Sequence, residues 1–257
     1  MGGRGLTVSW TWASARCQGT SHLRDATPCQ DAVRCIVSGT PDEILIAVGS
    51  DGAGSARFAG QGSALVSRSI SENARSYFST NAALPSDDEV WLWMDITRDR
   101  IGDAASARSS ELRDFAATLV AVFATETEVL VMHVGDGAAV LRMDGNWTVP
   151  SWPANGEYAS TTFFVTDEPA PQLRITRLVG RTGAVAVFSD GLERLALKFD
   201  ANSAYAPFFD GIFKPVMAST TKGRDRELSA ALGRYLNSAA VNERTDDDKS
   251  LILALRK

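Results

Sequence analysis

The most constraining feature of this sequence is an apolar run that ends abruptly in an acidic residue between glycines. Residues 44–48 read Ile-Leu-Ile-Ala-Val, and Gly49, Ser50, Asp51 and Gly52 follow them. A short apolar run bounded by turn residues predicts a strand that is covered on both faces. Glycines beside the acid let the backbone approach a ligand closely. The sequence therefore places a carboxylate at the end of a core strand, as either a helix cap or a metal ligand.

The same arrangement recurs at three further strand ends. These are Gly135-Asp136-Gly137, Ser189-Asp190-Gly191 and, in mirror form before the last apolar run, Asp246-Asp247-Asp248. Each site alone is compatible with an ordinary turn, because Asp-Gly is a common turn pair. Together the four favour a shared role, since magnesium and manganese are held by a few carboxylates. The pattern predicts a two-metal site that acts on a phosphoryl group.

Length and composition predict one domain spanning residues 1–257. The chain has 257 residues, of which 44% are apolar and 22% charged, as in ordinary globular proteins. The net charge of -5 argues against nucleic acid as the main partner. We expect no membrane association, because no apolar run approaches the roughly 18 residues that a span requires. Cys17, Cys29 and Cys35 lack the Cys-x-x-Cys spacing, so we expect reduced thiols and a cytoplasmic location.

Strands and helices are predicted in separate blocks. Alternating or apolar patterns predict strands at residues 6–14, 31–37, 44–50, 115–124, 129–134, 138–143, 161–165, 173–179, 184–189 and 250–255. Helical patterns cover residues 57–78, 90–108, 192–197, 208–217 and 226–237, and residues 17–30 are predicted to be a polar loop. Segregated blocks indicate an α+β fold with mainly antiparallel sheets. Two stacked sheets flanked by helices, a four-layer αββα sandwich, would use every block.

Motifs for other phosphate or metal chemistries fail on individual residues. A dinucleotide-binding Gly-x-Gly-x-x-Gly that begins at Gly52 ends in Arg57, and no Gly-Lys-Ser/Thr P-loop is present. An EF-hand loop that begins at Asp246 has Leu251 where glycine is required. A haloacid-dehalogenase-type phosphatase needs a second aspartate at the position of Ala53, and the chain has no Gly-x-Ser-x-Gly.

Six short motifs occur together, in a characteristic order, over nearly the whole chain. They are Gln30-Asp31, Ser50-Asp51-Gly52-x-Gly54, Ala117-Thr118-Leu119, Gly135-Asp136-Gly137, Ser189-Asp190-Gly191-Leu192 and Asp247-Asp248-Lys249-Ser250-Leu251. Because the six motifs occur in this order and spacing, the chain resembles the protein phosphatase 2C family. Thr20-Ser21-His22 and Gly156-Glu157-Tyr158 are more similar to its bacterial stand-alone members. The resemblance implies a helix-flanked β-sandwich, two Mn²⁺ or Mg²⁺ ions, and hydrolysis of phosphoserine and phosphothreonine.

The resemblance also implies which residues hold the ions. Asp51 matches the carboxylate that bridges both metals, and Gly52 matches the residue whose backbone carbonyl binds one of them. Asp190 and Asp247 match ligands of the other metal. Asp136 matches the ligand of a third, weaker metal that many bacterial members bind.

The family's phosphate-binding arginine has no counterpart in register. The corresponding position is occupied by Ala26. Arg24 in the same loop and Arg57, at the start of the helix after the metal-binding turn, are the candidates for this role. His22 in the same loop is a further candidate.

A second departure concerns proton transfer. Ala53 stands where many members carry a histidine that is thought to protonate the leaving alkoxide. His22, or water at the metals, must then supply the proton. By resemblance Asp31 is the catalytic acid that hydrogen-bonds a water held by the metals, beside Asp51.

Three polar residues have alternative interpretations. Asp246 and Asp248 flank the proposed ligand Asp247, and the sequence does not decide which of them faces the metals and which faces solvent. His133 lies inside a predicted strand, where a hydrogen-bonded sheet histidine is favoured over a metal ligand.

The leading hypothesis is a metal-dependent protein serine/threonine phosphatase. Its expected partners are phosphorylated proteins, in particular a cognate bacterial serine/threonine kinase or the targets of that kinase. One alternative is a non-catalytic regulatory module of a protein kinase, motivated by Ala53 and the missing arginine. A small-molecule phosphohydrolase is the other. Metal binding distinguishes the first alternative, and turnover of phosphopeptides against nucleotides distinguishes the second.

Overall fold

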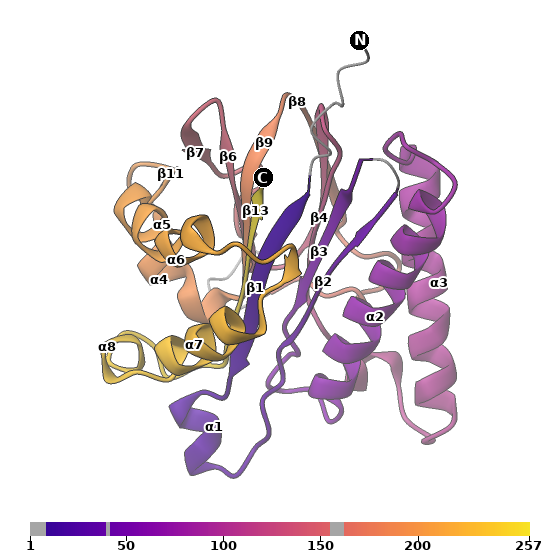
Figure 1. Cartoon of the computed structure of the whole chain (residues 1–257). Helices are drawn as coiled ribbons and strands as arrows, with labels where there is room; N and C mark the ends of the chain where they lie inside the picture. Colours follow the sequence, from indigo (N-terminus) through magenta and orange to yellow (C-terminus); the bar gives the residue numbers. More distant parts are fainter. Residues whose placement is uncertain (1–8, 40–41, 155–161) are drawn as a thin grey trace.

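The computed structural model describes residues 9–39, 42–154 and 162–257, and these contain two large stacked sheets (Figure 1). One sheet has the order β2 (Ala32–Ser38), β3 (Ile44–Ser50), β4 (Leu119–Ala124), β5 (Glu128–Val134) and β8 (Arg174–Val179). The other has the order β12 (Gly223–Arg224), β1 (Trp10–Cys17), β13 (Lys249–Arg256), β9 (Thr182–Phe188), β6 (Ala138–Met143) and β7 (Asn146–Thr148). Every pairing within the two sheets is antiparallel except that of β1 with β12.

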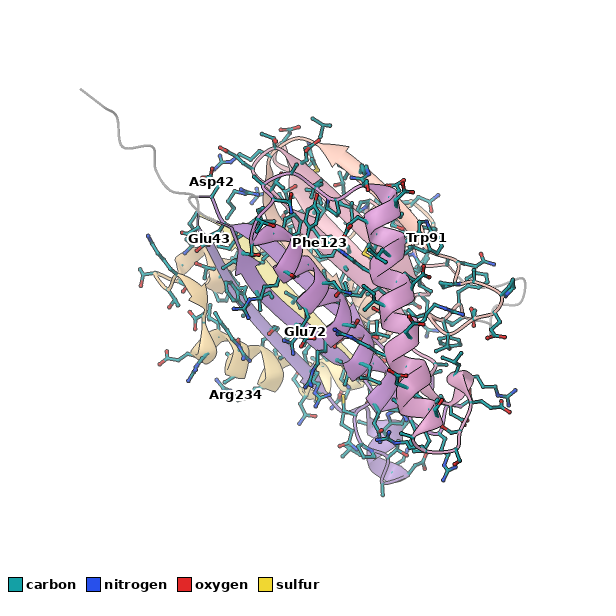
Figure 2. All side chains as sticks on the ribbon, turned by 90° about the vertical axis from the view of Figure 1, so that its right-hand side faces the viewer. Asp42, Glu43, Glu72, Trp91, Phe123 and Arg234 are labelled. Atoms are coloured by element: carbon teal, nitrogen blue, oxygen red, sulfur yellow. The ribbon has the colours of Figure 1, made fainter. Side chains whose placement is uncertain are left out.

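Helices cover the outer faces of both sheets. The long helices α2 (Ala59–Phe78) and α3 (Asp87–Ser106) lie over the five-stranded sheet, as Figures 1 and 2 show. The shorter helices over the six-stranded sheet are α4 (Glu193–Ala196), α5 (Ala206–Ile212), α6 (Lys214–Ala218), α7 (Arg226–Leu236) and α8 (Ala239–Asn242). This is the predicted four-layer αββα sandwich.

The apolar run of β3 is continuous because both of its faces are covered. Leu45 and Ala47 pack in the layer between the two sheets, whereas Ile44, Ile46 and Val48 pack against α2 and α3. All five side chains are at most 4% exposed. A third apolar layer lies between the six-stranded sheet and its helices. The strand therefore delivers its terminal acid from a firmly held position.

Local signals account for the start of α3. Ser86 caps α3 by accepting a hydrogen bond from the backbone N–H of Glu89 at 3.2 Å. Three acidic residues, Asp87, Asp88 and Glu89, occupy the first turn of α3, where they complement the helix dipole. The observed α2 and α3 begin within three residues of the predicted helices.

Several predicted boundaries differ from the observed ones. The predicted polar loop 17–30 contains a short helix, α1 (Thr20–Arg24). The predicted helix 208–217 is divided into α5 and α6, since Pro215 lies in the first turn of α6, where its missing N–H is tolerated, and not in the interior of one long helix. Residues 162–165 of the predicted strand 161–165 form no strand, only an isolated bridge residue at Thr162. The predicted strand 6–14 begins outside the described residues and is observed as β1.

The remaining elements are too short to produce a sequence pattern. They are β10 (Leu197–Lys198), β11 (Ser203–Ala204) and two 3-10 turns, η1 (Leu112–Phe115) and η2 (Asp190–Leu192). The Gly156-Glu157-Tyr158 motif lies outside the described residues. In the described ranges we find no helix that is both long and apolar enough to span a membrane.

Candidate metal centre

Four of the predicted metal-binding aspartates lie on the wall of one cavity of about 540 Å³. Asp51 follows β3 and Asp136 follows β5, both in the five-stranded sheet. Asp190 follows β9 and Asp247 precedes β13, both in the six-stranded sheet. Gly52 also lines this cavity. The four strand ends therefore meet at the junction between the two sheets, as the sequence predicts.

Glycines allow the chain to close tightly around this junction. A Cβ on Gly191 would overlap the carbonyl oxygen of Asp248, which joins the turn after β9 to the segment before β13. A Cβ on Gly52 would overlap the carbonyl oxygen of Ala59 at the start of α2. Both neighbours are backbone atoms that cannot move aside cheaply. The glycines next to the acids are therefore required by packing.

Thr118 holds the turn that carries Asp51. The Asp51 backbone N–H donates to Thr118 Oγ1 at 3.0 Å, and the Thr118 N–H donates to the carbonyl oxygen of Asp51 at 2.8 Å. The hydroxyl of Ser50 donates to the Thr118 carbonyl oxygen at 2.6 Å. These bonds connect the ends of β3 and β4 and orient the Asp51 carboxylate.

Asp31 lies in the interior next to the cavity and is fully buried. The hydroxyl of Ser189 donates to Asp31 Oδ2 at 2.7 Å, and the N–H of Ser250 donates to that hydroxyl oxygen at 2.9 Å. Arg16 donates to the backbone carbonyl of Asp31 at 2.6 Å. Asp31 Oδ1 is buried and has no hydrogen-bond partner among the described residues. One carboxylate oxygen is thus anchored and the other is left to interact.

The carboxylates shift one another's pKa upward. Burial, followed by the charges of Asp136 and Asp247, raises the pKa of Asp190 to about 8. Burial and the charges of Asp31 and Asp190 hold the pKa of Asp51 well above its usual range. Burial is the largest cause of the raised pKa of Asp136, and the charge of Asp247 raises it further. Without a cation the cluster retains protons, and a bound divalent cation would favour the charged forms.

The donors of the cluster suit a hard divalent cation. They are all oxygens, and Asp190 Oδ1 is buried with no partner among the described residues, as is Asp31 Oδ1. Within the described ranges, no three His, Cys, Asp or Glu side chains are already gathered around one point as a closed ligand set. Magnesium and manganese are commonly bound by one or two carboxylates with several waters, so an open arrangement fits them.

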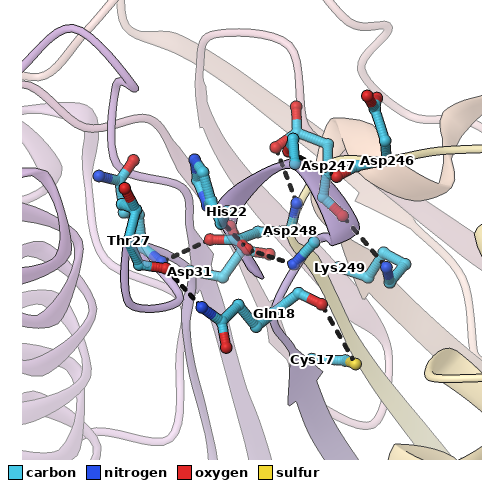
Figure 3. Close-up of polar contacts among 12 residues, drawn as sticks. Cys17, Gln18, His22, Thr27, Asp31, Asp246, Asp247, Asp248 and Lys249 are labelled. Atoms are coloured by element: carbon cyan, nitrogen blue, oxygen red, sulfur yellow. Dashed lines mark hydrogen bonds and ion pairs between the residues drawn. The ribbon is translucent and has the colours of Figure 1, made fainter. Parts of the chain in front are cut away.

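Asp248 organises the loop that carries His22 (Figure 3). Its carboxylate accepts the backbone N–H groups of Gly19 at 2.6 Å and Gln30 at 2.5 Å. The same carboxylate lies 3.0 Å from Nδ1 of His22, which lines the cavity. Asp246 is 70% exposed. Of the three consecutive aspartates, only Asp247 lines the cavity, while Asp248 is buried behind it.

The two arginines predicted to bind phosphate are not on the cavity wall. The Arg24 side chain is 71% exposed and pairs with Asp246 at 3.4 Å. Arg57 is exposed and stacks over the ring of Phe58 at 5.0 Å. No lysine or arginine of the described residues lines the cavity. Their observed contacts are with a neighbouring carboxylate and an aromatic ring.

The structure adds cavity residues that the sequence did not single out. Asp25 and Thr162 line the cavity, and Thr162 Oγ1 donates to Asp136 Oδ2 at 2.5 Å. Ser189 belongs to the Ser189-Asp190-Gly191-Leu192 motif, but its hydrogen bond to Asp31 joins residues that are 158 positions apart in the sequence. No local pattern reports such a contact. Asp25 carried no signal beyond its place in a polar loop.

His133 is a structural residue of β5, as expected. It is fully buried, and its Nδ1 lies 2.8 Å from the hydroxyl of Ser151 and 3.0 Å from a guanidinium nitrogen of Arg174. Burial and the charge of Arg174 lower the pKa of His133 to about 3. The ring is therefore neutral at ordinary pH and does not belong to the acidic cavity.

Comparisons with known proteins agree with this geometry. Residues 18–237 match the family model described as protein phosphatase 2C. The serine/threonine-protein phosphatase 3 of Escherichia coli (strain K12) is 38% identical over 255 residues, which cover 96% of this chain and 99% of that protein.

Solved structures share the fold at much lower identity. The PppA protein of Pseudomonas aeruginosa has a TM-score of 0.64 at 16% identity, covering 98% of this chain and 100% of that one. The catalytic domain of the serine threonine protein phosphatase PstP, in complex with two manganese ions, has a TM-score of 0.63 at 14% identity, covering 97% and 99%. At these identities the likeness concerns the fold.

Proposed function

The chain belongs to the protein phosphatase 2C family, and on that premise we propose that the cavity between the two sheets is its active site. The protein is a metal-dependent serine/threonine phosphatase. One observation carries the placement of the active site, namely that aspartates from four strand ends of two sheets line a single cavity. We propose that residues 1–257 form one catalytic domain, since both sheets contribute to that cavity.

Asp51, Gly52, Asp190 and Asp247 are proposed to hold two divalent cations, manganese or magnesium, with Asp136 holding a third. The relative that was solved with two manganese ions supports this number. When bound, such cations neutralise phosphoryl oxygens and lower the pKa of water. The raised pKa values of the aspartates indicate how strongly a positive charge would be favoured at this place.

The chain's own residues are proposed to divide the proton transfers. Hydrolysis forms a bond from water oxygen to phosphorus, breaks the ester P–O bond, and returns a proton to the serine or threonine oxygen. Asp31, anchored through one oxygen, orients the water with the other. His22 lines the cavity with its Nδ1 3.0 Å from the Asp248 carboxylate, and its Nε2 is the proposed proton donor to the leaving oxygen. This would compensate for Ala53, which has no donor.

Phosphate binding by Arg24 or Arg57 is retained as a proposal. Arg24 directly precedes the lining residue Asp25, and Arg57 lies two residues after the lining residue Ser55. Both side chains are exposed and long enough to reorient when a substrate arrives.

Phosphorylated proteins are the proposed substrates, in particular a cognate bacterial serine/threonine kinase or its targets. A cytoplasmic location is proposed because the three cysteines are free, as suits a reducing compartment.

Replacing the central aspartate tests the placement of the active site. With Mn²⁺, the purified protein should hydrolyse p-nitrophenyl phosphate and a phosphothreonine peptide. Asp51→Asn should lower kcat by about 100-fold or more and weaken Mn²⁺ binding measured by calorimetry, because a charged ligand is lost. Asp144→Asn is the matched control, since Asp144 is exposed in the turn after β6 and has a φ of 49° that asparagine tolerates.

Full activity of Asp51→Asn would contradict the proposed site. An inactive wild-type protein that nevertheless binds Mn²⁺ would contradict the activity, and one that binds no Mn²⁺ would favour a regulatory module.

A further inference from the structure

A second cavity of about 540 Å³ opens beside β2, the edge strand of the five-stranded sheet. It shares no lining residue with the acidic cavity. Its walls come from β1, β2, β12 and α2. Figure 1 shows β2 between β1 and α2, and β12 pairs with β1. Four arginines line it, one from each element: Arg16, Arg34, Arg68 and Arg224.

The positive charge of this cavity is not balanced by its surroundings. No aspartate or glutamate lines it, and none of the four arginines forms an ion pair with the described residues. The nearest acid along α2, Glu72, stands one turn after Arg68 but pairs with Arg100 of α3 at 3.0 Å. The chain as a whole has a net charge of -5, so this cavity has the opposite sign to the molecule.

The arginines also retain unused hydrogen-bond donors. Nε of Arg34 is buried and has no partner among the described residues. Arg16 uses Nη1 to donate to the backbone carbonyl of Asp31, and each guanidinium carries five N–H donors in all. A buried donor requires an acceptor, and the cavity wall offers no carboxylate.

We propose that this cavity binds a small polyphosphate anion, either inorganic or carried by a nucleoside. The planar fork of arginine pairs with phosphate oxygens through two parallel hydrogen bonds. Four such forks around one cavity suit a ligand with two or more phosphate groups better than a single monoester. The volume lies within the range of small-molecule sites. Ile36, on the face of β2 toward α2, and Ala64 of α2 provide an apolar wall against which a nucleoside can pack.

A structural role is the competing explanation. Charged side chains on an edge strand prevent edge-to-edge pairing with another chain, and β2 is such a strand. That explanation requires no ligand and therefore predicts no saturable binding.

The test is calorimetric titration of the full chain in saturating Mg²⁺ with sodium tripolyphosphate, ATP and AMP. Arg34→Gln/Arg68→Gln should weaken tripolyphosphate binding by at least about tenfold, because two charge-assisted pairs are lost. Arg16 is left unchanged in this variant, since it also holds Asp31. The matched control, Arg113→Gln/Arg181→Gln, removes the same charge from exposed positions outside the cavity and should bind within about twofold of wild type.

A second variant distinguishes binding in this cavity from binding in the active site. Asp51→Asn should bind tripolyphosphate as wild type does, whatever the outcome for phosphatase activity. Equal affinity for ATP and tripolyphosphate would show that the phosphates alone are recognised. Tighter binding of ATP would show that the apolar wall also contacts the nucleoside. Both results support the site. AMP should bind at least about tenfold more weakly.

Three outcomes overturn the proposal. They are no saturable binding of either polyphosphate, binding lost in Asp51→Asn but kept in Arg34→Gln/Arg68→Gln, and a hexaglutamate peptide that binds more tightly than tripolyphosphate. If the double variant does not fold by circular dichroism, the exposed single variants Arg68→Gln and Arg224→Gln replace it.

Discussion

Adjacent identical residues have different tasks in this chain. Asp246 is exposed and pairs with Arg24, Asp247 lines the acidic cavity, and Asp248 is buried and accepts two backbone N–H groups. Only the last contact immobilises the loop that carries His22. A buried carboxylate with several donors is a strong anchor, whereas an exposed ion pair contributes little. The burial of each carboxylate, and not its identity, decides its role.

The position of His22 leads to a prediction about leaving groups. His22→Asn keeps a polar amide near the Asp248 carboxylate, which lies 3.0 Å from Nδ1 in the native chain, but removes the proton donor at Nε2. With a phosphothreonine peptide, kcat should fall by about 100-fold, since the alkoxide needs a proton. With p-nitrophenyl phosphate the loss should be below about threefold, because nitrophenolate leaves without one.

The two substrates serve as each other's control in this experiment. Equal losses on both would show that His22 supports the structure of the site and does not donate the proton.

Strand ends bring the site together through close backbone contacts. Gly191 in η2 allows the turn after β9 to touch the carbonyl of Asp248, directly before β13. This contact fixes the distance between the turn that carries Asp190 and the segment that carries Asp247. The glycine is therefore as important to the geometry of the cavity as the acids themselves.

A single methyl group should disturb this contact. Gly191→Ala should lower the free energy of unfolding by about 1–3 kcal/mol, because the new Cβ overlaps a backbone oxygen. It should also weaken Mn²⁺ binding by displacing Asp190. Gly102→Ala is the control: Gly102 lies in α3 with open space around it, so helix propensity should stabilise the protein by up to about 1 kcal/mol.

Urea unfolding of both variants measures these changes. Unchanged stability and metal affinity in Gly191→Ala would show that the two segments can separate without cost.

At one end of the two sheets, carboxylates from both sheets line the same cavity and repel one another. The pKa of Asp190 is raised from 3.8 to about 8 in the folded chain, so the native state binds more protons than the unfolded state between these values. His133, whose folded pKa is about 3, opposes this effect below pH 6.5, because its unfolded form still binds a proton there. Above pH 6.5 His133 is neutral in both states, so Asp190 makes stability without metal fall as pH rises toward 8.

Metal removal should make this dependence visible. With a chelator, Tm should fall between pH 6.5 and pH 8.5. Mn²⁺ at about 100 times its Kd should add about 2.7 kcal/mol. At one fixed Mn²⁺ concentration its effect should be larger at pH 8.5 than at pH 6.5, because fewer protons must be displaced. Thermal unfolding measures both. Asp190→Asn should flatten the slope in chelator, and an equal slope in this variant would assign the pH dependence to other groups.

The sequence by itself determined the β and α blocks and the acids at the strand ends. Periodicity is local: the run from Ile44 to Val48 is apolar because both of its faces are covered, and the acid after it is visible in the letters. The layered fold and the cavity aspartates could therefore be predicted. The division of the helix near Pro215 also has a local signal, which the prediction of one helix overlooked. The short edge strands could not be predicted, because they depend on neighbours more than on pattern.

Only the tertiary structure decided which polar residues meet. Asp248 contacts Gly19 across 229 positions, and Ser189 contacts Asp31 across 158. Arg24 and Arg57 are engaged by Asp246 and Phe58, partners that no motif specifies. The four arginines beside β2 come from separate elements and form a cluster only when the sheets stack. A side chain's role depends on burial and partners in space, and folding alone creates these.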